Sequence, residues 1–319
     1  MTRRLERQEF RAMGTSCAVA AYASVPERSN ALRALAAART EVAECERVLT
    51  RFDPHSDLSR LNSSAGSWVD VDARVLAALE ASLRARRQTQ GRFDPTILPA
   101  LVAAGYDRTF DELEPRPAAS VDGWRASARV VVDADNGRAR VEAGAAVDLG
   151  GIGKGFSAER ALRAMRWAWP ELTGGLVDLG GDIAFYGVPA GAASAWHVAV
   201  ADPRVPGSTL TTLRLRRAGV ATSGRDRRRF GPEHSLHHLI DPATGAPADS
   251  GPLAVTVVAP DATEAEVHAT ALAIAPLEDA RAHVDAQPAV SALYVPHEGP
   301  PVQLGPLPVV PQVMIEVAA

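Results

Sequence analysis

Apolar residues recur at steps of three and four residues in two long stretches of the first third of the chain. In residues 30–49 they include Leu35 and Val42, and residues 72–89 follow the same spacing. A helix turns once in about 3.6 residues, so this spacing lines one helix face with apolar side chains. The pattern predicts amphipathic helices over both stretches. Two further helices are predicted over residues 156–169 and 264–274.

Short apolar runs bounded by turn residues predict strands in the rest of the chain. The clearest is a hairpin, in which residues 129–133 and 138–142 flank the tight-turn pair Asn136-Gly137. Ser56 is placed to cap a short helix, and residues 91–99 are expected to form a loop fixed by two prolines. The other predicted strands cover residues 16–22, 195–200, 209–215, 253–259 and 290–295. Helices and strands follow one another without a long linker, which predicts a mixed α/β (α+β) fold with β-sheets flanked by helices.

The pentapeptide Val-Asp-Leu-Gly-Gly occurs twice, at residues 147–151 and 177–181. Five residues are too few to establish an internal duplication. The first copy continues as Ile152-Gly-Lys-Gly155, directly before a predicted helix. Backbone N–H groups at such a helix start attract anions, which makes this glycine turn a candidate phosphate site. Its spacing is neither the Walker pattern nor a dinucleotide fingerprint, and glycines that merely allow close packing are the alternative.

Lys154 in this turn is the only lysine of the chain, and the other 33 of its 34 basic residues are arginine. An ammonium is a compact point charge on a flexible stem, whereas a guanidinium is a planar fork. A single lysine at a glycine turn therefore favours a phosphate contact, with arginine-biased composition as the alternative. Asp148, just upstream, could accept from a ribose or a base, or could orient the loop.

Composition and charge exclude several classes of protein. The chain has 319 residues, 46% of them hydrophobic, and a net charge of −4, which does not suggest a nucleic-acid partner. The basic run 225–229 contains an acid and predicts a solvated loop. No window reaches the length of a membrane span, and the N-terminus has no leader-like apolar region, so a cytoplasmic location is expected. Cys17 and Cys45 form no metal motif or disulfide framework.

Two later segments also carry candidate chemistry. Thr222 and Ser223 offer hydroxyl and amide donors. His238 and Asp241 could act as a base with its orienting acid or as phosphate contacts, although Asp241 also begins a plain turn motif. His237 and His238 together invite a zinc interpretation, but no third and fourth ligand stands at a usual spacing.

Glu266 and Thr270 lie four residues apart, which places them on one face of the predicted helix over 264–274. A carboxylate with a hydroxyl is oxygen ligation that suits Mg²⁺, which takes few protein ligands and leaves room for phosphate oxygens. An exposed glutamate beside an ordinary helix threonine is the alternative. His268 lies on a different face of the helix and is not expected to be a ligand.

Together these segments resemble the family of ApbE-type FAD:protein FMN transferases, in order and over about residues 13–275. The resemblance is carried by Met13-Gly-Thr15, Phe52-Asp-Pro54, Ser56-Asp-Leu-Ser-Arg-Leu-Asn62, Gly91-Arg-Phe-Asp-Pro-Thr96, Asp148-Leu-Gly-Gly-Ile-Gly-Lys-Gly155, Leu179-Gly-Gly-Asp-Ile183, Thr222-Ser-Gly224, His238-Leu-Ile-Asp-Pro-Ala-Thr-Gly245 and Ala269-Thr-Ala-Leu272. It implies a single ApbE-like flavin transferase domain over residues 13–300, an N-terminal extension over 1–12 and a proline-bearing C-terminal tail over 301–319.

The resemblance also implies an activity. Such proteins bind FAD, need Mg²⁺ and transfer FMN through its phosphate to a Ser or Thr of an acceptor flavoprotein, releasing AMP. The implied FAD contacts are Met13, Phe52, Arg92, Phe93, Asp94, Asp148, Lys154 and Ile240, joined by the candidates Thr222 and Ser223. Phe52 would lie against the isoalloxazine ring. Mg²⁺ would be held by Glu266, Thr270 and the backbone carbonyl of Gly151, and His238 with Asp241 would form the catalytic pair.

The sequence departs from the family pattern at two of these positions. Glu266 stands where the family has Asp, and the extra methylene moves the carboxylate by roughly 1.5 Å, which bears on a metal with tight octahedral geometry. Phe52 stands where Tyr is frequent. An FAD pyrophosphatase is one alternative, because the same site could use water as the acceptor. A flavin-binding protein without turnover is another, favoured if Glu266 fails to hold Mg²⁺. An oxidoreductase is disfavoured, because neither glycine turn has the expected spacing.

Overall fold

The computed structural model describes residues 3–113, 117–119, 121, 123–188, 195–225 and 229–310. The middle of the basic run 225–229 and the last nine residues of the predicted tail lie outside the described residues. None of the helices in the described ranges is both long enough and apolar enough to cross a membrane. The cytoplasmic location stays a prediction.

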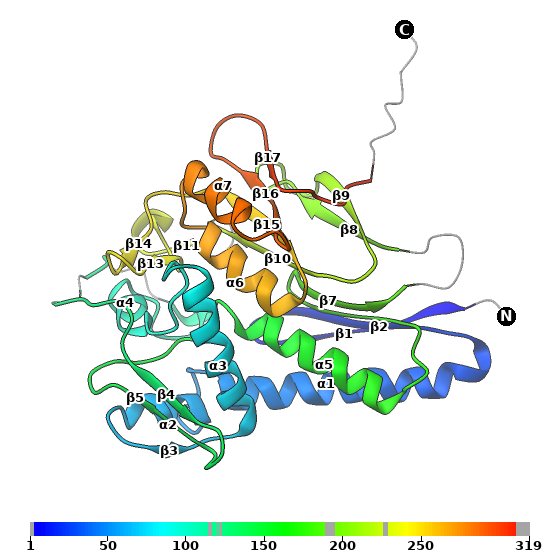
Figure 1. The fold of residues 1–319 in the computed structure, drawn as a ribbon, viewed down its shortest axis with the longest axis horizontal. Helices are drawn as coiled ribbons and strands as arrows, with labels where there is room; N and C mark the ends of the chain where they lie inside the picture. The colour runs from blue at the N-terminus through cyan, green and yellow to red at the C-terminus, as the bar shows by residue number, and fades with distance from the viewer. Residues whose placement is uncertain are drawn as a thin grey trace, which may run out of the picture.

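An eight-stranded antiparallel sheet forms the centre of the molecule (Figure 1). Each apolar run that was predicted as a strand of this sheet is observed as one, which confirms the mixed α/β fold. In spatial order the strands are β1 (Arg4–Ala12), β2 (Thr15–Ala23), β6 (Gly174–Leu179), β7 (Asp182–Gly187), β10 (Gly219–Gly224), β15 (Ala254–Ala259), β16 (Ser291–Val295) and β17 (Val302–Leu304).

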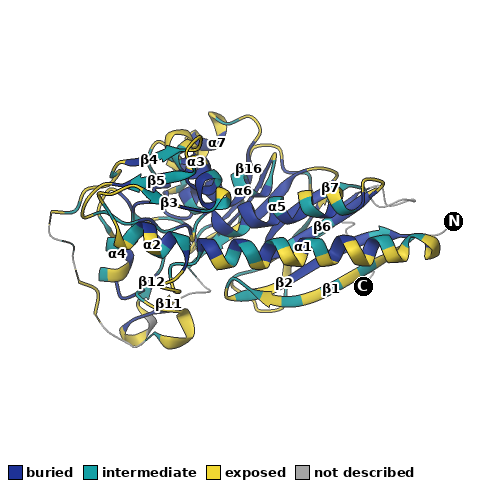
Figure 2. Ribbon diagram, turned by 90° about the horizontal axis from the view of Figure 1, so that it is seen from below, coloured by how far each residue is buried: buried dark blue, intermediate teal, exposed yellow. Residues whose placement is uncertain are grey.

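Three helices cover one face of this sheet. α5 (Gly153–Ala168) packs on β6 and β7, α6 (Ala262–Leu272) packs on β10 and β15, and α1 (Arg28–Leu49) packs on α5. α1 and α5 have a buried inward side and an exposed outward side, as the amphipathic spacing predicted, whereas α6 has no exposed residue (Figure 2). α7 (Leu277–Asp285) follows α6 and contacts β16 and β17.

The opposite face of the sheet is covered by the hairpin of β8 (Trp196–Ala201) and β9 (Thr209–Leu215), which shares an apolar cluster with Ile183 and Val220. A separate lobe holds the predicted hairpin, observed as β4 (Val130–Asp133) and β5 (Arg138–Val141). The remaining elements of the lobe and its surroundings are α2 (Asp57–Ser63), β3 (Val69–Asp70), α3 (Ala73–Gln88), α4 (Leu98–Ala103), β11 (Arg229–Phe230), β12 (Leu236–His237), β13 (Ile240–Asp241) and β14 (Ala246–Pro247). Ser56 caps α2 as predicted, accepting from the N–H of Ser59 at 3.0 Å.

Some predicted boundaries are wrong, and α6 lies two residues before its predicted range. α5 begins at Gly153, three residues before the predicted start, so Lys154 lies within the first turn of the helix. Pro99 lies in the first turn of α4 instead of a loop, where its missing N–H costs no helical hydrogen bond. The division into an extension, a domain and a tail stays a prediction. Within it, β1 pairs with β2 and β17 pairs with β16, so both flanking segments add strands to the sheet.

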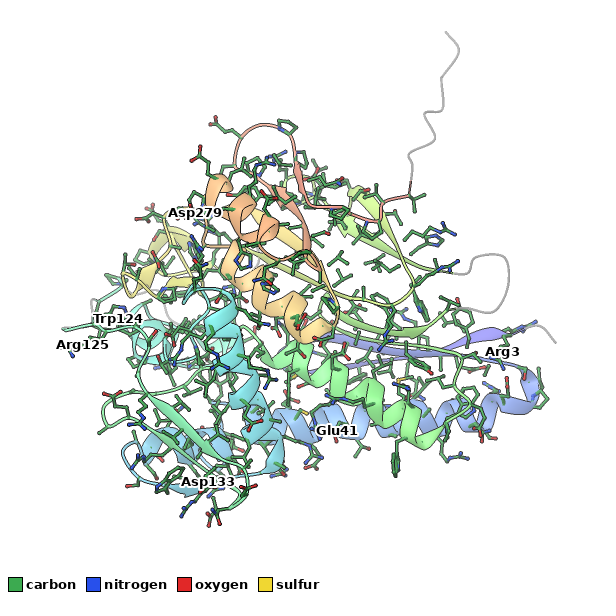
Figure 3. The ribbon with its side chains drawn as sticks, in the orientation of Figure 1. Arg3, Glu41, Trp124, Arg125, Asp133 and Asp279 are labelled. Carbon is green, nitrogen blue, oxygen red and sulfur yellow. The ribbon has the colours of Figure 1, made fainter. Side chains whose placement is uncertain are left out.

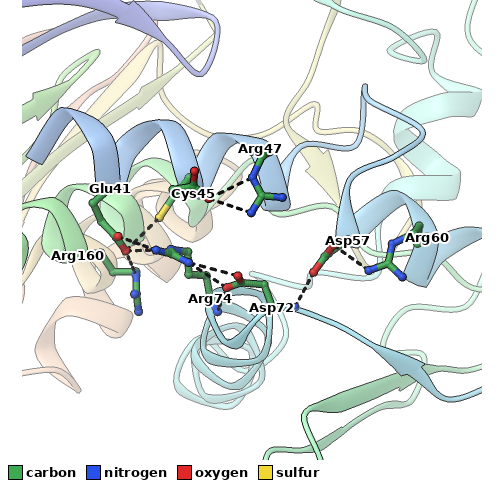
Figure 4. Close-up of polar contacts among 9 residues, drawn as sticks. Glu41, Cys45, Arg47, Asp57, Arg60, Asp72, Arg74 and Arg160 are labelled. Carbon is green, nitrogen blue, oxygen red and sulfur yellow. Dashed lines mark hydrogen bonds and ion pairs between the residues drawn. The ribbon is translucent and has the colours of Figure 1, made fainter. Parts of the chain in front are cut away.

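Glu41 connects three helices through ion pairs (Figure 4). Its carboxylate, on α1, accepts from Arg74 of α3 at 2.9 Å and from Arg160 of α5 at 2.6 Å. All three side chains are largely buried, with exposed fractions of 14, 22 and 29%. Partial burial alone would raise the pKa of the Glu41 carboxyl, but the hydrogen bonds from both arginines outweigh that effect and lower the pKa.

We expect Glu41→Gln to lower the free energy of unfolding by about 1–3 kcal/mol, because two guanidinium groups lose their shared counter-ion. This range lies between the costs of breaking an exposed and a fully buried ion pair. Urea unfolding measures this difference. Glu44→Gln is the matched control, since Glu44 lies on the same helix and forms an exposed pair with Arg47 at 2.8 Å. Equal effects of the two variants would contradict a connecting role for Glu41.

Candidate functional site

The first glycine turn is held in place by helix α2 and by the loop around Pro95, both distant from it in sequence. The side-chain amide of Asn62 donates to the carbonyl of Val147 at 2.8 Å, and the N–H of Val147 donates back to it at 2.7 Å. The N–H of Asp148 donates to the carbonyl of Pro95 at 2.8 Å. The segments predicted to share a site, around residues 56–62, 91–96 and 148–155, therefore meet at the start of α5.

Lys154 lies between two buried carboxylates at this point. Its ammonium group donates to Oδ2 of Asp182 and to Oε1 of Glu266, whose side chains are only 3% and 2% exposed. The other oxygen of Glu266, Oε2, accepts from the N–H of Gly155 at 2.7 Å. The sequence predicted an open anion site at this helix start. In the structure the chain's own Glu266 supplies an anion there, because α6 crosses α5 at its first turn.

The charges of this cluster depend on one another. Burial disfavours the charged form of Lys154, but the adjacent carboxylates of Asp182 and Glu266 outweigh it and raise the pKa of the ammonium above its usual value. Burial raises the pKa of the Glu266 carboxyl, and the nearby Asp182 raises it further. Lys154 and the Gly155 N–H lower it, but the pKa stays above its usual value. The ammonium is thus the positive charge that allows two carboxylates to share a buried space.

The three predicted metal ligands lie on neighbouring turns of the same cluster. The hydroxyl of Thr270 donates to the carbonyl of Gly151 at 3.2 Å, and Glu266 lies one turn earlier on α6. A side chain at position 151 would come within 3.0 Å of Thr270 and 3.2 Å of the Phe93 ring, so only glycine leaves this space open. Phe93, a predicted FAD contact, is thereby placed beside the cluster.

These residues fit Mg²⁺ by the chemistry of their donors. A carboxylate, a hydroxyl and a carbonyl are hard oxygen ligands, and Mg²⁺ usually completes its shell with water and phosphate. No three His, Cys, Asp or Glu side chains gather as a metal site in the described ranges. A metal at this position would therefore depend on one carboxylate and two neutral oxygens from the protein.

A second cluster, of aromatic rings, is connected to the first through Asp148. Oδ2 of Asp148 forms an ion pair with Nε of Arg51 at 2.8 Å, and its Oδ1 accepts from the N–H of Gly150 at 2.7 Å. The guanidinium of Arg51 lies 4.2 Å from the centre of the Phe52 ring and 4.7 Å from that of Tyr106. Phe52 is 40% exposed, so its ring is accessible to a ligand.

Tyr106 is the centre of this aromatic cluster. Its ring centroid lies 6.0 Å from that of Phe52, 5.8 Å from that of Phe230 and 6.5 Å from that of His238. Ile240 is buried in the same apolar group. The structure therefore brings together Phe52, His238 and Ile240, three residues that the sequence assigned to one site.

Arg51 was not predicted as a site residue, although it directly precedes Phe52. We expect Arg51→Lys to weaken FAD binding about tenfold, because a lysine cannot both pair with Asp148 and stack on two rings. Quenching of flavin fluorescence measures the affinity. Arg47→Lys, four residues earlier and exposed on α1, is the control. Unchanged affinity in Arg51→Lys would separate the aromatic cluster from FAD binding.

Three other predicted FAD contacts have partners within the protein. Oδ1 of Asp94 accepts from the N–H and the hydroxyl of Thr96 at 2.8 and 2.7 Å, and its Oδ2 accepts from Ser127. Arg92 pairs with Asp279 of α7 at 2.8 Å (Asp279 is labelled in Figure 3). The N–H of Met13 donates to Glu46 at 2.5 Å in the tight turn between β1 and β2.

Thr222 and Ser223 point to opposite faces of the sheet, since side chains alternate along a strand. The side chain of Thr222 points to the same face of the sheet as that of Val220, which belongs to the apolar cluster with the β8–β9 hairpin. The Thr222 hydroxyl lies 2.9 Å from that of Thr256. It lines a cavity of about 330 Å³ under the β8–β9 hairpin. Asp182 and Lys154 lie on the other face. Sequence adjacency suggested one site for Thr222 and Ser223, but the pleat of β10 separates their side chains.

Asp241 caps its own turn. Its Oδ1 accepts from the N–H of Ala243 at 2.9 Å, and its carbonyl accepts from the N–H of Gly245 at 2.8 Å. The indole of Trp124, labelled in Figure 3, covers this turn and donates to the carbonyl of Pro242 at 2.9 Å. These contacts favour the plain-turn interpretation of Asp241.

His237 is a structural residue. It is buried, its Nδ1 accepts from the N–H of Leu239 at 3.3 Å, and its Nε2 lies 3.1 Å from the carbonyl of Ala248. An accepting Nδ1 requires the proton on Nε2, so both nitrogens of the neutral ring are in use. Burial and the nearby Arg225 lower the pKa of His237 to about 4. The zinc interpretation of the histidine pair therefore loses one of its ligands.

Comparison with known proteins gives the family that this chain matches. A model of the ApbE family matches residues 13–294. The chain is 32% identical over 303 residues to the FAD:protein FMN transferase of Treponema pallidum (strain Nichols), covering 89% of this chain and 82% of that protein. It is 25% identical over 253 residues to the protein of the same name from Escherichia coli (strain K12), covering 76% and 71%.

Solved structures of similar fold include the ApbE protein from Thermotoga maritima. That structure has a TM-score of 0.81 and 27% identity, and the match covers 94% of this chain and 97% of that one. The apo form of the flavinyl transferase ApbE from Pseudomonas stutzeri has a TM-score of 0.76 at 21% identity, covering 94% of each chain, and supports the fold.

Proposed function

The chain belongs to the ApbE family, and on that premise we propose that it binds FAD and transfers FMN to a serine or threonine hydroxyl of an acceptor protein, with Mg²⁺ as cofactor. Its class of activity is flavin transfer, since the similar proteins are named FAD:protein FMN transferases. The metal, the acceptor residue and the roles of individual side chains are the proposed parts.

One observation carries the proposal. The glycine turn joins two clusters: Asp148 pairs with Arg51 beside the exposed Phe52 ring, and Gly151 and Lys154 further along the turn contact Thr270 and Glu266. FAD carries a pyrophosphate and a flat aromatic isoalloxazine in one molecule. Phe52 offers an exposed ring for stacking, with the buried Tyr106 packed beside it, while Lys154 offers a positive charge for the pyrophosphate.

The reaction can be written with these groups. The acceptor hydroxyl oxygen attacks the phosphorus of the FMN half, the bond from that phosphorus to the bridging oxygen breaks, and AMP leaves with that oxygen. The proton of the hydroxyl passes to a base, for which His238 beside Tyr106 is the candidate. Lys154 would stabilise charge on the phosphate oxygens. Mg²⁺, held by Glu266, Thr270 and the Gly151 carbonyl, would offset the charge of the pyrophosphate.

The test is incubation of the purified chain with FAD, Mg²⁺ and a domain that presents a candidate threonine. AMP is followed by chromatography, and the mass of the acceptor is followed by mass spectrometry. Equal amounts of AMP and flavinylated acceptor support transfer, and loss of both in EDTA supports the metal. AMP with free FMN would instead identify an FAD pyrophosphatase. Bound FAD without AMP, under several divalent metals, would leave a flavin-binding protein without turnover.

A further inference from the structure

We propose that Lys154 takes the place of the metal at Glu266 while the metal is absent, and that Asp182 retains the ammonium when Mg²⁺ displaces it. The inference rests on the proposed metal site and adds two things to it. It makes Asp182 a positioning residue for Lys154, and it connects metal binding to the release of a positive charge for FAD.

The contacts of Glu266 show why an exchange is needed. One carboxylate oxygen accepts from Lys154 and the other from the N–H of Gly155. To ligate a metal beside Thr270 and Gly151, the carboxylate must give up at least one of these contacts. The Gly155 N–H belongs to the backbone of α5 and is fixed, whereas the ammonium of Lys154 ends a flexible four-carbon stem. The Lys154 contact is therefore the one that yields.

The charge balance favours the same exchange. While both buried carboxylates are ionised, the one ammonium that they share leaves the cluster with a net negative charge. A divalent cation at Glu266 supplies the missing positive charge, and Lys154 stays paired through Asp182. Within the described ranges, Lys154 is the only basic side chain that forms an ion pair with Asp182. Asp182 opens β7 directly after the second glycine turn, so its backbone is held by the sheet.

A consequence for FAD follows from this exchange. Once Lys154 has left Glu266, two of its three N–H donors are available to phosphate oxygens while Asp182 holds the third. Metal binding and FAD binding therefore strengthen each other, and the coupling must be equal in both directions. In a variant without Lys154, no ammonium competes with the metal for Glu266. The part of the coupling between metal binding and FAD binding that comes from Lys154 is then lost.

The single lysine makes the exchange directly observable. Full-length protein grown with ¹³C,¹⁵N-lysine gives NMR signals from Lys154 alone. On titration with Mg²⁺ and no FAD, we expect the Lys154 Nζ and Cε signals to shift and the order parameter of the ammonium to fall, because one of two anchors is lost. Calorimetry on the same samples measures Mg²⁺ affinity. If Mg²⁺ acted only through its charge near Lys154, the signals would shift but the order parameter of the ammonium would not fall.

Variants test the same exchange by affinity. Without FAD, Lys154→Met should bind Mg²⁺ about tenfold more tightly than the parent, and Asp182→Asn about tenfold more weakly, within the range for groups that support metal ligands. Arg47→Met, which removes an exposed cation, should match the parent. The NMR measurement on the parent does not depend on whether Lys154→Met folds. Mg²⁺ binding with an unchanged Lys154 order parameter would overturn the exchange and leave the metal site standing, whereas no Mg²⁺ binding would overturn both.

Discussion

Lys154→Met is expected to abolish AMP release from FAD and to lower the free energy of unfolding by about 3–5 kcal/mol, the cost of leaving a buried charge without its partner. The variant leaves Asp182 and Glu266, both almost fully buried, without a counter-ion. Urea unfolding and chromatography of AMP measure the two effects.

Lys154→Arg separates charge from shape at the same position. A guanidinium keeps the positive charge, but its planar fork is too wide for the space between Asp182, Glu266 and the first turn of α5. We expect this variant to be more stable than Lys154→Met and still to lose most FAD affinity or turnover. If Lys154→Arg matched the parent in both FAD affinity and AMP release, the single lysine would be a coincidence of composition.

Glu266→Gln is expected to reduce AMP release at least about a hundredfold, because it removes the only carboxylate among the proposed metal ligands. The amide keeps the size of the side chain and can still accept from the Gly155 N–H, so the fold should be retained. Raising the Mg²⁺ concentration should recover part of the activity if the defect is in metal binding. Circular dichroism and AMP release over a range of Mg²⁺ concentrations measure both.

Glu264→Gln is the matched control for this variant, since Glu264 lies two residues earlier on α6 and outside the cluster. Glu266→Asp adds a second comparison. It keeps the charge and restores the residue type of the family pattern, but the shorter side chain cannot keep both Lys154 and the Gly155 N–H. Parent-like activity in Glu266→Gln would exclude Glu266 as a ligand of a catalytic metal.

The sequence by itself determined many of the elements and supplied the residues of the candidate site. The apolar spacing of residues 30–49 predicted α1, and Asn136-Gly137 predicted the β4–β5 hairpin, because both signals are local. The glycine turn, Lys154, Glu266 and Thr270 could be chosen because their chemistry is unusual at that spacing. The residues around Phe52 and His238 were grouped into one site by their resemblance to a family, and the structure places them side by side.

Only the tertiary structure decided which of these residues act on one another. Lys154, Asp182 and Glu266 lie on α5, β7 and α6. They meet because α6 crosses the first turn of α5 near the start of β7. The alternation of side chains along β10 likewise separates Thr222 from Ser223. Local sequence fixes what each segment forms and which groups it carries. Burial and charge pairing depend on segments that are distant in sequence, so they become defined only when the chain has packed.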